Sequence, residues 1–296
     1  KCILATGNQL PGNPKVPNSS FFQSPNYFQN PWSIDSVLGL KETDDVLIVG
    51  NGLTMVDTVL GLLEQGFGGR IFSLSRHGYG IFPHRESEVS FAIESVEELT
   101  HMSLLELVKF VNYHRKELRS NGVSVEVVVD ALRPYTQEIW RNFTVNERKL
   151  FMSRFRHLWG VARHRIPLLI HDKIQQLRTE NKLHILSGKI VDFSENENLI
   201  RVRYTDKQDA IKTLEVARVI NCTGPESDLE KLDGHFLHSA FNEGIITQDE
   251  LKLGIKTDVE TFRVKKPDGK CYTNLHTIGT NLKGELWESR QPNVSI

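Results

Sequence analysis

Asp45-Val46-Leu47-Ile48-Val49-Gly50-Asn51-Gly52-Leu53-Thr54-Met55 is the stretch that decides the fold. Its first five residues form a short apolar run, which is typical of a strand buried on both faces of a parallel sheet. From Thr54 to Gln65 apolar residues recur at helical spacing, and Gly66 stands where a helix C-cap glycine belongs. Arg70 to Ser75 predicts a second strand, so the sequence predicts a strand–helix–strand unit of about 30 residues.

The turn between this strand and this helix has the pattern Gly50-x-Gly52. In a dinucleotide site the first glycine permits a tight turn, and the second lets the backbone approach the pyrophosphate. The helix N-terminus adds unpaired N–H groups and its positive dipole end. A tight turn without a ligand is the alternative. The residues expected to hold a pyrophosphate are Gly50, Asn51, Gly52, Leu53 and Thr54.

The second predicted strand ends in Ser75-Arg76-His77, where an NAD enzyme places an acidic residue against the ribose hydroxyls. No carboxylate is present there. Arg76 can pair with a 2′-phosphate and Ser75 can donate to it, so the sequence favours NADPH over NADH. The alternative is a solvated arginine at a strand end.

The rest of the chain predicts helices followed by short strands. We expect a mostly helical insertion over about residues 88–180. A β-meander should follow, with strands at Leu183–Leu186, Lys189–Phe193, Ile200–Tyr204 and Leu214–Asn221. The fold class is therefore α/β, with a Rossmann-like domain that carries a helical insertion and a meander.

Composition excludes several classes of protein. The 36 Lys+Arg and 37 Asp+Glu leave a net charge of -1, which disfavours a nucleic-acid binder held by phosphate contacts. The longest apolar stretch contains Asn51 and Asp57, so we expect no membrane span. Three cysteines without a CxxC pair favour a reducing, cytoplasmic location. No zinc-type spacing of Cys and His occurs, and we expect no metal.

Two segments share one local form, an apolar strand that ends in Thr-Gly: Ile3-Leu4-Ala5-Thr6-Gly7 and Val219-Ile220-Asn221-Cys222-Thr223-Gly224. The strand–helix–strand unit lies between them. In this order the chain resembles two-dinucleotide flavoproteins, in which such segments mark the crossings into and out of the NAD(P)H domain.

More specifically, the chain is similar to the FAD/NAD(P)-binding protein family, which is related to flavin-dependent monooxygenases. The likeness covers nearly the whole chain. The stretches that carry it are Asn30-Pro31-Trp32, Gly50 to Asp57, Ser75-Arg76-His77-Gly78, Leu132-Arg133-Pro134, Ile139-Trp140, Arg163-His164-Arg165, Asn221 to Pro225, and Ile278-Gly279 through Gly284-Glu285-Leu286-Trp287-Glu288.

The resemblance implies an FAD domain interrupted by an NAD(P)H domain, with hydride passing from nicotinamide to flavin. It assigns residues 1–40 and 223–296 to a partial, discontinuous FAD-binding domain and 41–222 to the NAD(P)H-binding domain. The family's first glycine-rich turn, which grips the ADP half of FAD, is expected before Lys1, so we expect an N-terminally truncated chain that binds FAD in the full-length protein. The residues implied on the FAD side are Thr6, Gly7, Thr223, Gly224, Gly279 and Thr280; related flavoproteins commonly have Gly-Asp where Gly279-Thr280 stands.

We therefore expect a region of a flavin-dependent oxidoreductase that uses NADPH, or NADH, to reduce FAD, with monooxygenase-like chemistry on an unidentified small-molecule substrate. No catalytic residue is assigned, because hydride transfer depends chiefly on how the two rings are positioned. The first alternative is a non-catalytic nucleotide-binding or protein-interaction module. The second is a nucleic-acid scaffold that uses the basic run from Arg154 to His164 and Arg165. The sequence leaves the oligomeric state open.

The four tryptophans, Trp32, Trp140, Trp159 and Trp287, are expected to be core or domain-contact residues. Trp287 is the one for which stacking on a flavin is the alternative.

Overall fold

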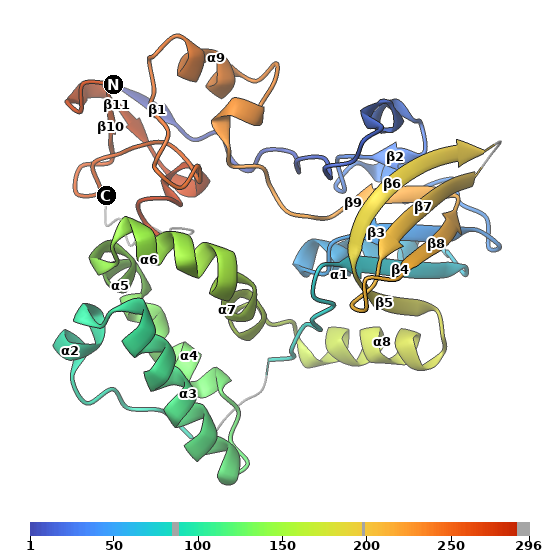
Figure 1. Cartoon of the computed structure of the whole chain (residues 1–296), viewed down its shortest axis with the longest axis horizontal. Helices are drawn as coiled ribbons and strands as arrows, with labels where there is room; N and C mark the ends of the chain where they lie inside the picture. Colours follow the sequence, from blue (N-terminus) through green and yellow to red (C-terminus); the bar gives the residue numbers. More distant parts are fainter. Residues whose placement is uncertain (85–88, 197–198, 289–296) are drawn as a thin grey trace. The chain divides into compact units, whose positions relative to one another are not determined.

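The computed structural model describes residues 1–84, 89–196 and 199–288. It divides into two compact units, whose elements are labelled in Figure 1. Unit 1 comprises the described residues of Lys1–Gln9, Glu86–Arg163 and Glu226–Ile296, and unit 2 those of Leu10–Arg85 and His164–Pro225.

Unit 2 is built on a five-stranded parallel sheet with the order β2-β9-β3-β4-β5. The central strand β3 is the predicted Asp45–Val49, and β4 is Arg70–Ser75, as predicted. Val46 pairs with Ile71 of β4 on one side and with Arg218 of β9 on the other. The remaining strands are β2 (Tyr27–Phe28), β5 (Leu183–Ser187) and β9 (Arg218–Asn221).

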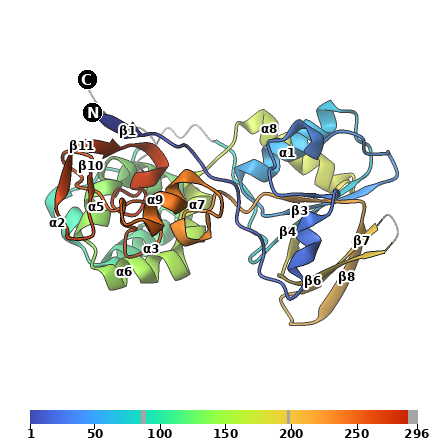
Figure 2. The same cartoon turned by 90° about the horizontal axis from the view of Figure 1, so that it is seen from above.

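Alternate residues of β3 enter two different cores. Val46 and Ile48 pack with helices α1 (Leu53–Glu64) and α8 (Leu168–Thr179). Leu47 and Val49 pack with the antiparallel strands β6 (Lys189–Asn196), β7 (Leu199–Thr205) and β8 (Ile211–Val216). Unit 2 thus has three layers, with the parallel sheet between the helices and the antiparallel strands (Figure 2). Burial on both faces explains why β3 is continuously apolar.

Helix α1 ends where the sequence predicts. Gly66 has φ 75°, its N–H donates to Leu63 O at 2.9 Å, and the Phe67 N–H donates to Leu62 O at 3.0 Å. This pair of bonds is the Schellman arrangement that satisfies the last carbonyls of a helix.

The predicted meander is wrong in two places. Its first strand, β5, pairs in parallel with β4 and belongs to the five-stranded sheet. The expected strand Leu214–Asn221 is divided at Ala217 between β8, which is mostly exposed, and β9, which is mostly buried. The Ala217 N–H donates to Asp45 O at 2.8 Å, so the chain changes sheets at this residue. The antiparallel meander consists of β6, β7 and β8 within the described residues.

Unit 1 contains the helices between β4 and Arg163. Trp140 lies at their core: its Nε1 donates to Gly284 O at 2.8 Å, and its ring stacks on Trp287 at 5.1 Å. These contacts join the helices to the C-terminal segment. The helical elements are α2 (Val96–His101), α3 (Leu104–Ser120), α4 (Glu126–Leu132), η3 (Arg133–Tyr135), α5 (Thr136–Asn142), α6 (Val145–Leu150), the π-helical turn η4 (Phe151–Phe155) and α7 (Arg156–Arg163).

The boundaries of the two compact units therefore differ from the boundaries expected for the two cofactor domains. Residues of the expected insertion up to Arg163 belong to unit 1, whereas α8 belongs to unit 2. The reason is long-range packing, because Leu253 and Trp287 complete the core of the helices, while Ile174 and Leu177 of α8 complete the core against β3.

The rest of unit 1 surrounds a small three-stranded sheet with the order β1-β11-β10. Strand β1 (Cys2–Leu4) is its parallel edge strand, and only Leu4 of its residues is buried. The other elements are β10 (Arg263–Lys265), β11 (Cys271–Thr277), α9 (Phe236–Asn242), η5 (Leu229–Lys231) and η6 (Gly279–Leu282), while unit 2 also contains η1 (Ser19–Gln23) and η2 (Ile34–Ser36).

Every helix within the described residues is too short or too polar to cross a lipid bilayer.

Candidate functional site

The turn after β3 depends on a glycine at position 50. Gly50 has φ 114°, and a Cβ at this position would lie 2.3 Å from Cys222 O, at the end of the neighbouring strand β9. Its N–H donates to Leu74 O at 2.8 Å. A side chain at this position would therefore meet both backbone strain and a clash. The tight turn predicted from the sequence is present.

The N-terminus of α1 follows this turn directly. Gly52 is its N-cap, and in the described part of the chain no side chain caps it. A Cβ on Gly52 would have no atom within 4 Å, so the space beside the N-cap is open. Asp57 lies beyond the first turn of α1, and partial burial raises the pKa of its carboxyl group. Uncapped N–H groups and a positive dipole end can receive an anion.

The side chain of Asn51 bonds to the loop after β4. Its amide nitrogen donates to the carbonyl of Tyr79, on the loop after β4. Ser73 of β4 donates its hydroxyl to Gly50 O at 3.0 Å and lies 3.3 Å from Asn51 Oδ1. Two side chains thus hold the turn against β4 and its loop.

Ser75 and Arg76 lie where β4 ends, as predicted. The Gly78 N–H donates to Ser75 Oγ at 3.0 Å, and Ser187 donates to Arg76 O at 3.1 Å. Arg76 is exposed. Both residues lie at the same end of the sheet as the Gly50 turn, because β3 and β4 are parallel neighbours. In open parallel sheets ligands bind at the carboxyl ends of the strands.

Thr223 and Gly224 also lie beside the Gly50 turn. The side chain of Asn221, fully buried, accepts hydrogen bonds from the Thr223 N–H at 3.2 Å and hydroxyl at 2.7 Å. Its amide donates to Gly12 O at 3.1 Å and to Tyr27 Oη at 3.0 Å. Burial raises the pKa of Tyr27, although its hydrogen bond to Asn221 opposes this shift. This network is not predicted from the sequence, in which its signal is an asparagine at the end of an apolar strand.

The other predicted residues lie together in unit 1. Thr280 donates its hydroxyl to Gly7 O at 2.8 Å, and Gly279 begins η6. Asn281 donates to Thr6 Oγ1 at 3.1 Å and to Thr277 Oγ1 at 3.0 Å. The two Thr-Gly segments expected on one FAD side are therefore in different units, with Thr223 and Gly224 in unit 2.

The basic run does not belong to one unit. Arg163 is the last residue of α7 in unit 1, and its Nε donates to Glu288 Oε2 at 3.0 Å. His164 and Arg165 belong to unit 2. The basic run is therefore divided between the two units and does not form one basic face on a single unit. Among the described residues, no group of His, Cys, Asp and Glu is placed to hold a metal ion.

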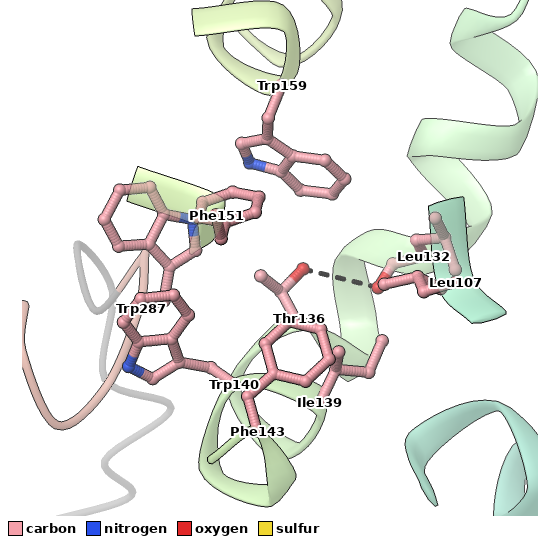
Figure 3. Close-up of a pocket in the computed structure, with 9 residues that line it drawn as sticks. All are labelled: Leu107, Leu132, Thr136, Ile139, Trp140, Phe143, Phe151, Trp159 and Trp287. Carbon is pink, nitrogen blue, oxygen red and sulfur yellow. Dashed lines mark hydrogen bonds between the residues drawn. The ribbon is translucent and has the colours of Figure 1, made fainter. Parts of the chain in front are cut away.

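A small apolar cavity lies among the helices of unit 1 (Figure 3). Its volume is about 40 Å³, and it is lined by aromatic rings that include Trp140, Trp159 and Trp287. The hydroxyl of Thr136 on its wall donates to Leu132 O at 3.3 Å. Its size suits a packing void and not a dinucleotide. Trp140 and Trp287 are core residues as expected, whereas Trp32 is 52% exposed and is not a core residue.

The sequence matches no family model and no curated protein. Several solved structures share the fold. L-lysine 6-monooxygenase from Pseudomonas syringae aligns with a TM-score of 0.58 and 18% identity, over 96% of this chain and 57% of its own. Ornithine hydroxylase from Pseudomonas aeruginosa aligns with a TM-score of 0.56 and 10% identity, over 98% of this chain and 57% of its own.

Ornithine N-hydroxylase from Kutzneria sp. 744, determined with reduced FAD, NADP⁺ and L-ornithine, aligns with a TM-score of 0.54 and 11% identity, over 97% of this chain and 59% of its own. The chain thus spans less than two thirds of the length of each of these structures. It shares the α/β fold of these monooxygenase structures, which confirms the fold class expected from the sequence.

Proposed function

We propose that unit 2 binds NADPH, with the pyrophosphate on Gly50, Asn51, Gly52, Leu53 and Thr54. The observation that carries this proposal is the uncapped N-terminus of α1, which follows a turn that only glycine fits. An uncapped helix end at the carboxyl edge of a parallel sheet is a receptor for a phosphate group.

The 2′-phosphate would bind at Ser75 and Arg76. An exposed guanidinium at the end of β4 can form a charge-assisted fork with a phosphate, and β4 is the strand next to the Gly50 turn. Residues 75–77, at this end of β4, include no carboxylate for the hydroxyls of NADH. This supports NADPH as the preferred nucleotide.

For the whole protein we propose a flavin-dependent oxidoreductase with monooxygenase-like chemistry. NADPH, when bound, would supply hydride for the reduction of FAD. The fold shared with lysine and ornithine monooxygenases supports this reaction class. Segments 1–40 and 223–296 would face FAD, with Thr6, Gly7, Thr223, Gly224, Gly279 and Thr280 along it. The substrate would be a small molecule, and the cytoplasm is the proposed compartment.

Titration calorimetry of the 296-residue chain with NADPH and NADH tests the nucleotide site. Gly52→Ala should weaken NADPH and NADH by the same factor, because both carry the pyrophosphate. The variant should stay folded, because the added methyl group meets no atom of the protein, and circular dichroism verifies this. Arg76→Ala should weaken NADPH about tenfold or more and leave NADH unchanged.

Absence of binding by the folded wild-type chain would overturn the nucleotide site. Equal losses of NADPH and NADH in Arg76→Ala would remove Arg76 from the 2′-phosphate site while leaving the pyrophosphate site intact.

A further inference from the structure

His77 and Tyr79 form an aromatic pair on the loop after β4. Their ring centroids are 5.1 Å apart and their planes are inclined by 14°. Both residues are exposed, Tyr79 to 39%. The loop after β4 thus carries an exposed pair of stacked rings, on whose outer face a further flat ring can stack.

The loop between the two rings is held by backbone geometry. Gly78 has φ 62°, and its N–H donates to Ser75 Oγ at 3.0 Å. A Cβ on Gly78 would lie 2.9 Å from the Cβ of Ser187, which itself bonds to Arg76 O. Residues 75–79 are thereby fixed on β5 as well as on β4.

The aromatic pair is also tied to the turn of the proposed pyrophosphate site. The side chain of Asn51, the middle residue of that turn, donates a hydrogen bond to the backbone carbonyl of Tyr79. The pair therefore belongs to the same local frame as the turn, and Arg76 directly precedes it in the sequence.

We propose that His77 and Tyr79 form the platform on which the adenine ring of the dinucleotide stacks. This inference rests on the proposed NADPH site and adds to it the residues that recognise the base. The adenine is joined to the ribose whose 2′-phosphate is assigned to Ser75 and Arg76, so it must lie within a few ångströms of them. Aromatic rings stack on any purine face and need no hydrogen-bond pattern. The platform accordingly contributes affinity for adenine nucleotides without distinguishing NADPH from NADH.

Tyr79→Ala and the matched control Tyr79→Phe test the platform in the 296-residue chain. Tyr79→Ala should raise the dissociation constants of NADPH and NADH alike, by about tenfold. It should raise that of adenosine 2′,5′-bisphosphate, which lacks the nicotinamide half, by the same factor. Tyr79→Phe keeps the ring and should stay within about twofold of the wild type for all three ligands. Circular dichroism verifies that both variants are folded.

The outcomes separate this inference from the function on which it rests. Unchanged affinities in Tyr79→Ala, with NADPH bound by the wild type, would overturn the platform and leave the NADPH site standing. A loss for NADPH without a loss for adenosine 2′,5′-bisphosphate would place Tyr79 against the nicotinamide half and overturn the platform too. If the folded wild type binds none of the three ligands, the NADPH site and the platform fail together.

Discussion

The two Thr-Gly segments are alike in sequence and differ in structure. Thr223 follows β9, which lies inside the five-stranded sheet between β2 and β3. Thr6 follows β1, which lies at the edge of the three-stranded sheet and pairs with β11. The hydroxyl of each threonine bonds to an asparagine, but Asn221 is two residues away whereas Asn281 is 275 residues away.

This difference shows that a short motif does not determine its own surroundings. At Thr223 the backbone of the preceding strand is buried, and the carbonyl of Cys222 would lie 2.3 Å from a Cβ on Gly50. At Gly7 a Cβ would have no atom within 4 Å. The segment near Thr223 is therefore closely packed by its neighbours, and three paired substitutions can test this contrast.

Gly50→Ala should have the largest effect. The new Cβ would clash with Cys222 O at a backbone angle that L residues avoid, so we expect a loss of at least about 3 kcal/mol of unfolding free energy. Gly7→Ala, at φ 68° without a clash, should cost about 1–2 kcal/mol. Urea denaturation measures both. Equal losses would mean that the Cys222 contact contributes nothing and that both glycines serve only the backbone angle.

Asn221→Ala should have the next largest effect. The Asn221 side chain is fully buried. Its removal leaves the Thr223 N–H without its acceptor, and Gly12 O and Tyr27 Oη without the amide that donates to them. Leaving several buried groups unpaired should cost about 3 kcal/mol. Asn281→Ala, beside the edge strand, should cost about 1–2 kcal/mol. A larger loss for Asn281 in the same denaturation experiment would reverse the ranking of the two segments.

The strand, turn and helix from Asp45 to Gln65 could be predicted because their signals are local. Continuous apolar residues, a two-glycine turn and helical spacing need no distant partner. Ser75 and Arg76 could be placed for the same reason, since a strand's end is visible in its sequence. The position of Gly66 followed from helix-capping chemistry alone.

The parts that could not be predicted depend on distant contacts. Trp140 bonds to Gly284, which is 144 residues away, and this packing places the helices in unit 1. Strand β5 resembles the meander strands in sequence, yet it pairs with β4 more than 100 residues earlier. Asn221 and Tyr27 meet across 194 residues. Periodicity describes which face of an element is buried and does not identify what covers it.

The smallest effect we predict is a pH dependence of the unfolding free energy, which arises in the segment around Thr223. Burial raises the pKa of the Cys222 thiol to about 12, although its contact with Thr58 opposes the shift. In the unfolded chain this thiol titrates near 9.0. Above that pH the unfolded chain loses a proton that the folded chain keeps, so the unfolding free energy should fall as pH rises, by up to about 1.4 kcal/mol per pH unit.

Urea denaturation between pH 8 and 10 measures this slope, and the range stops where Tyr27 begins to add its own loss. Cys222→Ala removes the titrating group, while Thr58 keeps its bond to Thr54 O at 2.9 Å. Its slope should be lower than that of the wild type. Cys2→Ala, at an exposed cysteine directly before the other segment, is the matched control and should leave the slope unchanged. If both variants keep the wild-type slope, the thiol of Cys222 exchanges protons with solvent in the folded chain, and the segment around Thr223 is more open than its packing implies.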